Sequence, residues 1–230
     1  DTTPQQEFGE WPTMTRTKQG QIDATRRNIA GFLMHPGMSD RWISYDSFAD
    51  QVMWAPAKEL AGRQNWRVFS DHNYVDVLIA AEGRGFKTFG AEVLRLSVLH
   101  AAKEKEMDSA QEWLSRIEWD GVSRVHSFLD RYFGVEPTAY SEAVSRYIWS
   151  AHAGRILVPG VQADMAPVFI GAQGARKTSA IKAISPNTDF YVEINLTARD
   201  DDLSRKLRGK LVGELEELRG LNSRENEEIK

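Results

Sequence analysis

A short stretch in the second half of the chain has the residue types and the spacing that bind phosphate groups. Gly171 is followed at the required distances by Lys177 and Thr178, which is the pattern of a phosphate-binding loop. In such a loop backbone N–H groups surround the phosphate oxygens, the lysine amine adds positive charge between the outer phosphates, and the hydroxyl binds Mg²⁺. We therefore expect Lys177 to be catalytic and Thr178 to be a metal ligand. The residues expected to hold the nucleotide are Gly171, Ala172, Gln173, Gly174, Ala175, Arg176, Lys177, Thr178 and Ser179.

Arg176 departs from this pattern, because the motif has glycine at the position before the lysine. If the backbone there needs a positive φ, a residue with a Cβ atom raises the free energy by about 1 kcal/mol or more. The sequence therefore supports nucleotide binding more directly than hydrolysis. The alternative interpretation is an ordinary strand-to-helix turn marked by Gly171 and Gly174, with Lys177 as a surface residue.

A group of carboxylates follows the apolar stretch that begins at Lys210. Glu214 is expected to help hold Mg²⁺ and to take part in catalysis, and Glu217 to polarise the attacking water as the general base. Glu216 is the competing choice for these roles, because the alternation of side chains along a strand does not decide between them. Taken alone, a glutamate-rich strand end usually marks the start of a solvated helix. The phosphate loop upstream is what favours the catalytic interpretation.

A sheet is needed to bring the loop and the carboxylates together. The apolar run before the loop is typical of a buried central strand, and helices and strands then alternate along the chain. This alternation predicts an α/β fold with a parallel sheet, in which the loop and the carboxylates converge at the C-terminal edge of the strands. The expected elements are a strand at 165–170, a helix at 177–184, a strand at 190–194, a helix at 201–207 and a strand at 210–215.

The first half of the chain is expected to form a mostly helical α+β accessory domain. Apolar residues at helical spacing predict a helix at 28–34 and another from Thr88, and alternation predicts a half-buried strand at 42–48. Ser109 and Glu112 form a capping box, and further helices are expected at 124–132 and 138–154. The expected divisions are a flexible leader at 1–20, the accessory domain at 21–118, a helical linker or lid at 119–160 and the ATPase core at 161–230.

Charge and composition limit the classes of partner and compartment. Lys and Arg number 29 against 33 Asp and Glu, a net charge of −4, so the field of the whole chain does not attract a polyanion. A nucleic-acid contact must therefore be local. The best candidate is the basic stretch of Arg16, Lys18, Arg26 and Arg27, for which a solvated face is the usual alternative. The absence of cysteine, of a long apolar run and of a secretion signal predicts a cytoplasmic protein without membrane contact.

Several of these stretches, with a turn upstream of them, resemble the virulence-associated protein E family of phages, prophages and phage satellites. That family is similar to a branch of the superfamily-three helicases within the AAA+ ATPases. The resemblance implies an AAA+-like P-loop core and an ATP-dependent DNA helicase or replication-initiation ATPase. It also implies ATP and Mg²⁺ as cofactors, a ring, often hexameric, around single-stranded or forked DNA, and contacts with replication proteins. The matching motifs are Trp119-Asp120-Gly121-Val122-Ser123-Arg124, Pro159-Gly160, the loop from Gly171 to Thr178, Leu207-Arg208-Gly209-Lys210 and Glu214-Leu215-Glu216-Glu217-Leu218.

The tryptophan motif is the most family-specific of these. From the residues alone, Trp119 is expected to be a packing anchor and the Asp120-Gly121 pair a turn. The core is expected to be incomplete at Lys230, because helicases of this type carry a sensor residue, DNA-contacting loops and an arginine finger further downstream. An alternative function is an assembly module that binds nucleotide with weak or no hydrolysis and recruits replication partners. A small-molecule kinase is a third, but residues 184–194 lack the arginine-rich lid expected of that class.

Overall fold

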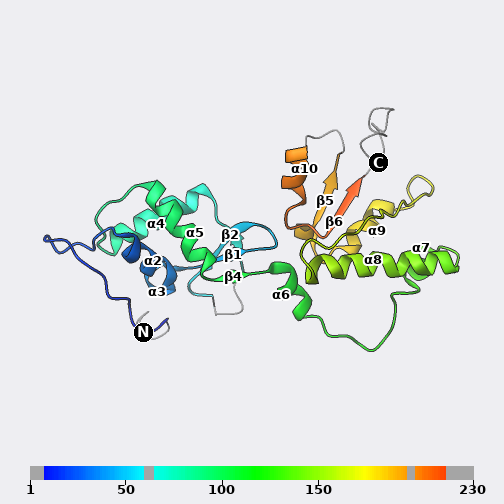
Figure 1. Ribbon diagram of the computed structural model, residues 1–230, viewed down its shortest axis with the longest axis horizontal. Helices are drawn as coiled ribbons and strands as arrows, with labels where there is room; N and C mark the ends of the chain where they lie inside the picture. The colour runs from blue at the N-terminus through cyan, green and yellow to red at the C-terminus, as the bar shows by residue number, and fades with distance from the viewer. Residues whose placement is uncertain (1–7, 60–64, 196–199, 216–230) are drawn as a thin grey trace. The chain divides into compact units, whose positions relative to one another are not determined.

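The computed structural model of the chain describes residues 8–59, 65–195 and 200–215 (Figure 1). Within these ranges the chain is a mixed α/β protein with helices and two small sheets. It divides into two compact units between Ser109 and Ala110, and each unit is described by itself. No helix in the described ranges is both long and apolar enough to span a membrane.

A four-stranded sheet in the order β3-β2-β1-β4 is the framework of the first unit. Strands β1 (Arg41–Asp46) and β2 (Gln51–Pro56) form an antiparallel hairpin, which confirms the strand predicted from alternation in this part of the sequence. The short strand β3 (Arg67–Val68) extends the sheet antiparallel to β2. The equally short β4 (Glu106–Met107) pairs in parallel with β1 and brings the chain to the end of this unit.

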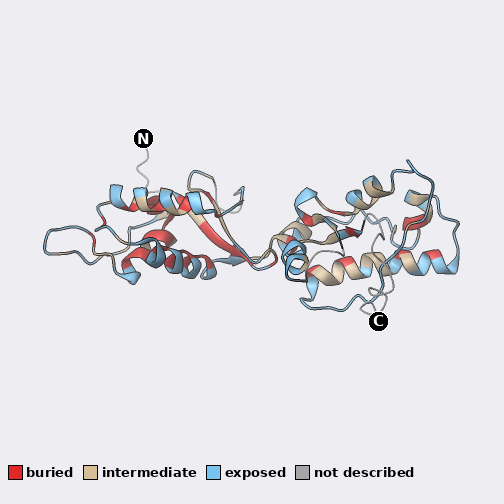
Figure 2. Cartoon of the chain, turned by 90° about the horizontal axis from the view of Figure 1, so that it is seen from above, coloured by how far each residue is buried: buried red, intermediate tan, exposed pale blue. Residues whose placement is uncertain are grey.

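Helices pack on this sheet through a stripe of apolar side chains. Ile29 and Phe32 of α2 meet Leu94 and Val98 of α5 and Ile43 of β1 in one core, and all five side chains are buried. The buried residues, red in Figure 2, accordingly gather on the sheet and on the helix faces that meet it. The helices of this unit are α2 (Arg26–Met34), α3 (Pro36–Ser39), α4 (Asp71–Gly83) and α5 (Ala91–Lys103).

The second unit begins with helices that are joined by serine and threonine side chains. Thr138 caps α8 by accepting the N–H of Ser141 at 3.1 Å, and the serine hydroxyl accepts the Thr138 N–H in return. Ser145 accepts the N–H of Leu129, which ties α7 to α8. The predicted helix at 138–154 is confirmed and continues for another turn. The helices here are α6 (Ser109–Ser115), α7 (Phe128–Phe133) and α8 (Ala139–Leu157).

The rest of the second unit alternates helices and strands as the sequence predicts. Strands β5 and β6 pair in parallel, α9 packs against β6 and α10 against β5. Gly213 of β6 lies so close to Ile194 that an added Cβ atom would stand 2.5 Å from the Ile194 Cδ1. The elements are α9 (Lys177–Ile184), a 3₁₀ turn (Thr188–Phe190), β5 (Tyr191–Ile194), α10 (Asp200–Leu207) and β6 (Val212–Leu215).

The strand predicted at 165–170 as the buried centre of the sheet is wrong. These residues form no strand, and the Ile170 side chain is 94% exposed. The segment instead lies against the helices: the Met165 N–H donates to the Tyr147 hydroxyl at 2.8 Å, and Phe169 stacks on Phe133. Among the described residues β5 and β6 pair only with each other, so this segment pairs with neither strand. A strand needs such a partner for its backbone groups, so the parallel core is limited here to two strands.

Candidate functional site

The backbone of the loop before α9 has the conformation of an anion-binding turn. Gly174 has φ of 81°, and Arg176, the N-cap of α9, has φ of 57° and ψ of 31°. Both values lie in the left-handed region, where glycine is favoured. The position that the motif normally gives to glycine therefore does require a positive φ, and Arg176 adopts it at a steric penalty of about 1 kcal/mol.

The Lys177 amine forms hydrogen bonds with the backbone at the start of the loop. Its Nζ donates to the carbonyl oxygens of Gly171 at 2.9 Å and Ala172 at 3.1 Å. The Ala175 N–H donates to the Ala172 carbonyl at 3.3 Å, which makes a tight turn at the tip of the loop. The amine is thus held beside the backbone that a phosphate would have to meet.

Several N–H groups of the loop remain available for an anion. Among the described residues, those of Gly174, Arg176 and Lys177 donate to no protein acceptor. Successive N–H groups that point to one side form a concave anion site, and the positive end of the following helix strengthens it. No acidic residue lies in the first turn of α9. The residues present therefore suit a phosphate group.

The other predicted loop residues have few contacts of their own. Thr178 is half-buried in the first turn of α9, one position after Lys177. Ala172, Gln173 and Ser179 are exposed, and their own side chains make no hydrogen bond to other residues that the structure describes. The loop thus presents mainly backbone groups, the Lys177 amine and the Thr178 hydroxyl.

Glu214 lies on β6 and is held by a neighbouring strand. Its side chain is 6% exposed, and its Oε2 accepts the Tyr191 hydroxyl of β5 at 2.5 Å. It pairs in register with Glu193, so the two carboxylates leave the parallel strands on the same face. Lys182 of α9 binds Glu193 at 2.7 Å and lies 5.1 Å from the centre of the Tyr191 ring.

This cluster was not identified from the sequence. Tyr191, Glu193 and Lys182 join α9 to the two strands, and only the strand register brings them to Glu214. The one signal in the sequence was the spacing of two residues between Tyr191 and Glu193, which places both side chains on the same face of a strand. The hydrogen bond and the positive charge of Lys182 lower the pKa of Glu193, which keeps this exposed carboxylate ionised.

The structure brings the loop and Glu214 onto elements that touch, but not into direct contact. Lys177 begins α9, and α9 packs on the strand that carries Glu214. No hydrogen bond or ion pair between described residues joins Lys177 to Glu214, and no three metal-ligating side chains cluster anywhere in the described ranges. Glu217, the expected general base, and Glu216, its competitor, lie outside the described residues.

The tryptophan motif forms a turn that is closed by its own side chains. Asp120 accepts two hydrogen bonds from Arg124, at 3.0 and 2.6 Å, and a third from the Val122 N–H. The bond from Arg124 is the largest cause that lowers the pKa of Asp120 from 3.8 to about 2. Gly121 has φ of 82°, which confirms the predicted turn. Trp119 is 78% exposed, so its prediction as a packing anchor is wrong. Among the described residues its ring N–H donates only to the Val122 carbonyl within the same turn.

Comparison with known families gives one match that covers both motifs. Residues 114–230 match the model of the virulence-associated protein E-like domain. The matched range contains the tryptophan turn, the phosphate loop and Glu214, and it starts shortly after the division between the two units. No curated protein matches the sequence.

Proposed function

The chain belongs to the virulence-associated protein E-like family, and from that membership we propose that it is an ATPase of phage-type DNA replication. Its second unit would be an AAA+-like P-loop core that binds ATP and Mg²⁺ and acts in DNA unwinding or replication initiation. The observation that carries this proposal is the loop before α9, in which positive φ angles at Gly174 and Arg176 leave N–H groups free beside the Lys177 amine.

The roles of the residues follow from their positions. The free N–H groups of the loop would bind the phosphates, and Lys177 would exchange its bonds to the Gly171 and Ala172 carbonyls for bonds to the outer phosphates. Thr178 and Glu214 would hold Mg²⁺, which when bound neutralises charge on the phosphates. Tyr191 would orient Glu214 through its hydroxyl, and Glu217 would take the proton of the attacking water.

Partners and compartment are part of the same proposal. The family is consistent with replication-associated phage-type proteins, and single-stranded or forked DNA is the substrate that such an ATPase would move along. A ring, often a hexamer, would let a neighbouring subunit supply the arginine that completes the site. Replication proteins in the cytoplasm would be its further partners.

Removal of the Lys177 amine tests the proposed function. Lys177→Ala should lower ATP turnover by about 100-fold or more, because the amine would stabilise charge that develops in the transition state. Turnover is measured at steady state with and without single-stranded DNA. Lys206→Ala, at an exposed lysine of α10, is the matched control and should behave like the unmodified protein. ATP hydrolysis by Lys177→Ala at the unmodified rate would remove the assignment.

A nucleotide-binding assembly module with weak or no hydrolysis is the second candidate. Two features of the loop favour this function. The strained backbone of Arg176 must be maintained when a nucleotide binds, and the bonds of Lys177 to the loop carbonyls must be rearranged. In that case nucleotide binding would persist while turnover stayed near the level of Lys177→Ala. Titration of ATP binding beside the turnover assay separates the two functions.

A further inference from the structure

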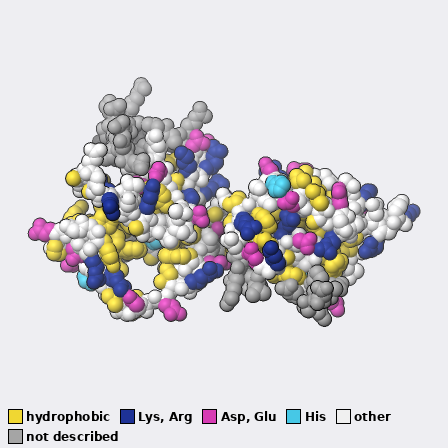
Figure 3. Space-filling view, turned by 180° about the vertical axis from the view of Figure 1, so that it is seen from behind, with side chains coloured by type: hydrophobic (Ala, Val, Ile, Leu, Met, Phe, Trp, Pro, Cys, Tyr) yellow, Lys and Arg dark blue, Asp and Glu magenta, His cyan; other side chains and the backbone are white. Residues whose placement is uncertain are grey.

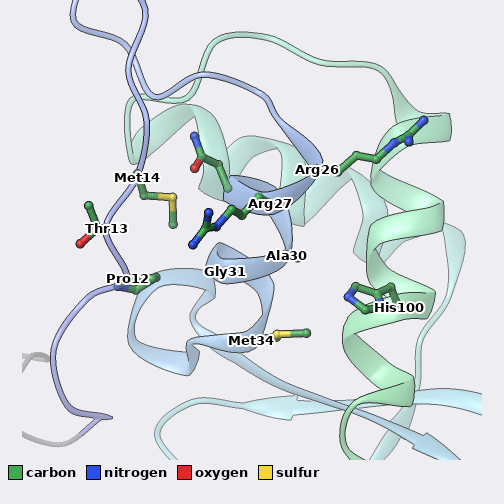
Figure 4. A pocket seen from close by; sticks show the side chains of 10 residues that line it. Pro12, Thr13, Met14, Arg26, Arg27, Ala30, Gly31, Met34 and His100 are labelled. Atoms are coloured by element: carbon green, nitrogen blue, oxygen red, sulfur yellow. The ribbon is translucent and has the colours of Figure 1, made fainter.

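A hollow of about 750 Å³ opens on the first unit, where the extended segment 12–14 passes over α2 (Figure 4). Its walls come from this segment, from the outer side of α2 and from His100 on α5. Sites for small molecules and cofactors typically measure about 300–1,000 Å³. The hollow lies outside residues 114–230, so the family match does not assign it.

Two arginines at this hollow have no acidic partner within the described ranges, whereas the Nδ1 atom of His100 lies 3.9 Å from the Oε1 atom of Glu104. Arg26 and Arg27 are exposed, and neither side chain makes a hydrogen bond or an ion pair with any residue that the structure describes. None of the lining residues is Asp or Glu, and the first turn of α2 has no acidic residue. By contrast, basic and acidic side chains are interspersed over the face shown in Figure 3. The local charge therefore favours an anion, although the net charge of the chain is −4.

The hollow is held open by a buried asparagine. Asn28 is 3% exposed, and its amide donates to the Thr15 carbonyl, the Thr15 hydroxyl and the Asp23 carbonyl at 2.8–2.9 Å. Its oxygen accepts the Thr15 N–H in return. These bonds fix the extended segment beside α2 in the free protein. A preformed wall of this kind reduces the conformational entropy that is lost when a ligand binds.

Part of the lining is apolar. Met14 and Met34 are half-buried, and the segment packs against Gly31, where an added Cβ atom would lie at an ordinary contact distance of 3.5 Å from Pro12. Methionine side chains are flexible and polarisable, and they adapt to flat partners. The hollow thus combines charged arginines at its rim with an apolar floor.

We propose that this hollow binds the backbone of single-stranded DNA, independently of the phosphate loop. In Figure 4 Arg27 points towards segment 12–14 and Arg26 away from it, so the two guanidinium groups do not converge on one phosphate and would contact different phosphates of a strand. Arginine binds phosphate oxygens with paired hydrogen bonds. Met14 and Met34 contact the sugars and the unpaired bases between those phosphates. In a duplex these bases would be stacked inside the double helix and out of reach.

Anisotropy of a fluorescein-labelled oligothymidine tests this site in the whole chain, without ATP or Mg²⁺, so that the result does not depend on the phosphate loop. The double variant Arg26→Ala with Arg27→Ala should bind about tenfold more weakly or worse. The slope of log affinity against log salt is negative, and its magnitude should fall by about 1.4, because two phosphate contacts to a single strand are lost. Arg27→Glu alone, which leaves α2 otherwise intact, should weaken binding in the same direction.

Lys18→Ala is the matched control, since Lys18 is an exposed cation of the same basic stretch outside the hollow. It should bind the oligothymidine nearly as the unmodified protein does. An equal loss in Lys18→Ala and in the arginine variants would overturn the proposal in favour of a diffuse basic surface. Unchanged binding in both arginine variants would overturn it too. Displacement of the oligothymidine by inorganic phosphate or ATP at equal phosphate concentration would replace it with a site for small anions.

Discussion

Arg176 is the residue at which this chain departs from its motif, and the structure gives the departure a physical meaning. Its φ of 57° is a conformation that glycine adopts freely and arginine adopts with strain. The sequence predicts strain if the backbone at this position needs a positive φ, and the backbone does have one. The backbone at Arg176 thus adopts the conformation that the glycine of the motif would adopt.

Replacement of this residue should relieve the strain. Arg176→Gly is expected to stabilise the second unit by up to about 1 kcal/mol in urea unfolding and to raise ATP turnover. Gly174→Ala introduces a Cβ atom at φ of 81° in the same loop and should have the opposite effect on stability. If Arg176→Gly unfolds at a lower urea concentration than the unmodified protein, the strain is not where the angle places it.

His152 is a second residue whose surroundings predict a measurable effect. It is buried at 9% exposure near Trp149 and Trp113, and no described residue bonds its Nε2. Burial lowers the pKa of His152 from its ordinary 6.5. As the pH falls through about 6.5, His152 therefore binds a proton in the unfolded chain before it does so in the folded protein. Stability is therefore retained above this pH and lost as the pH falls below it, by at most about 1.4 kcal/mol per pH unit.

Urea unfolding between pH 7.5 and 5 measures this dependence. His152→Leu should flatten it, because the variant has no group at this position to protonate. His126→Gln, at an exposed histidine of the same unit, should leave the dependence as it is. A pH dependence in His152→Leu as steep as in the unmodified protein would assign the effect to other groups.

At the scale of elements, the sequence predicts those whose signals are local. The helix at 177–184 has the predicted bounds, and β5, α10 and β6 lie within two residues of theirs, because turn residues and periodicity mark their ends. The prediction of a strand at 165–170 is wrong, since a strand also depends on the edge of a partner strand, and the sequence of the segment itself carries no information on that partner. Strand β2 was not predicted, because apolar and polar residues do not alternate along its sequence, which also contains a proline.

The candidate site divides in the same way. The start of α9 at Lys177 could be predicted, because glycine and lysine at fixed spacing mark it locally, but the positive φ at Arg176 could be stated only as a condition. The contact between Tyr191 and Glu214 could not, because it depends on the parallel register of β5 and β6. Trp119 was misplaced for a related reason: a large aromatic side chain predicts burial, but the turn around Asp120 satisfies its own hydrogen bonds and leaves the ring outside.

The bond between β5 and β6 gives an element-scale prediction. Tyr191→Phe removes the hydroxyl that Glu214 accepts and leaves a buried carboxylate oxygen with one partner fewer. The second unit should lose about 1–3 kcal/mol in urea unfolding. Tyr140→Phe, at a tyrosine that is 79% exposed, is the control and should change little. Equal unfolding midpoints for Tyr191→Phe and Tyr140→Phe would mean that the hydroxyl contributes nothing to the pairing of the strands.

At the scale of the whole molecule, the two units carry two proposed anion sites of different kinds. The second unit contains the family domain and the phosphate loop, and the first holds the hollow beside α2. Because the net charge is negative, each site must rely on backbone N–H groups or unpaired cations nearby rather than on the field of the chain. An ATPase that acts on DNA needs one site for the nucleotide and another for the strand, and the proposals assign these to separate units.

The most direct test of the central claim observes the backbone amides of the loop while ATP and Mg²⁺ are added. Amide NMR should show shifts for Gly174, Arg176 and Lys177, because their free N–H groups would then donate to phosphate oxygens. Asn28 in the first unit, whose bonds are internal, should stay unchanged. Loop amides that do not move at saturating ATP, or shifts confined to other residues, would contradict a phosphate site at this turn.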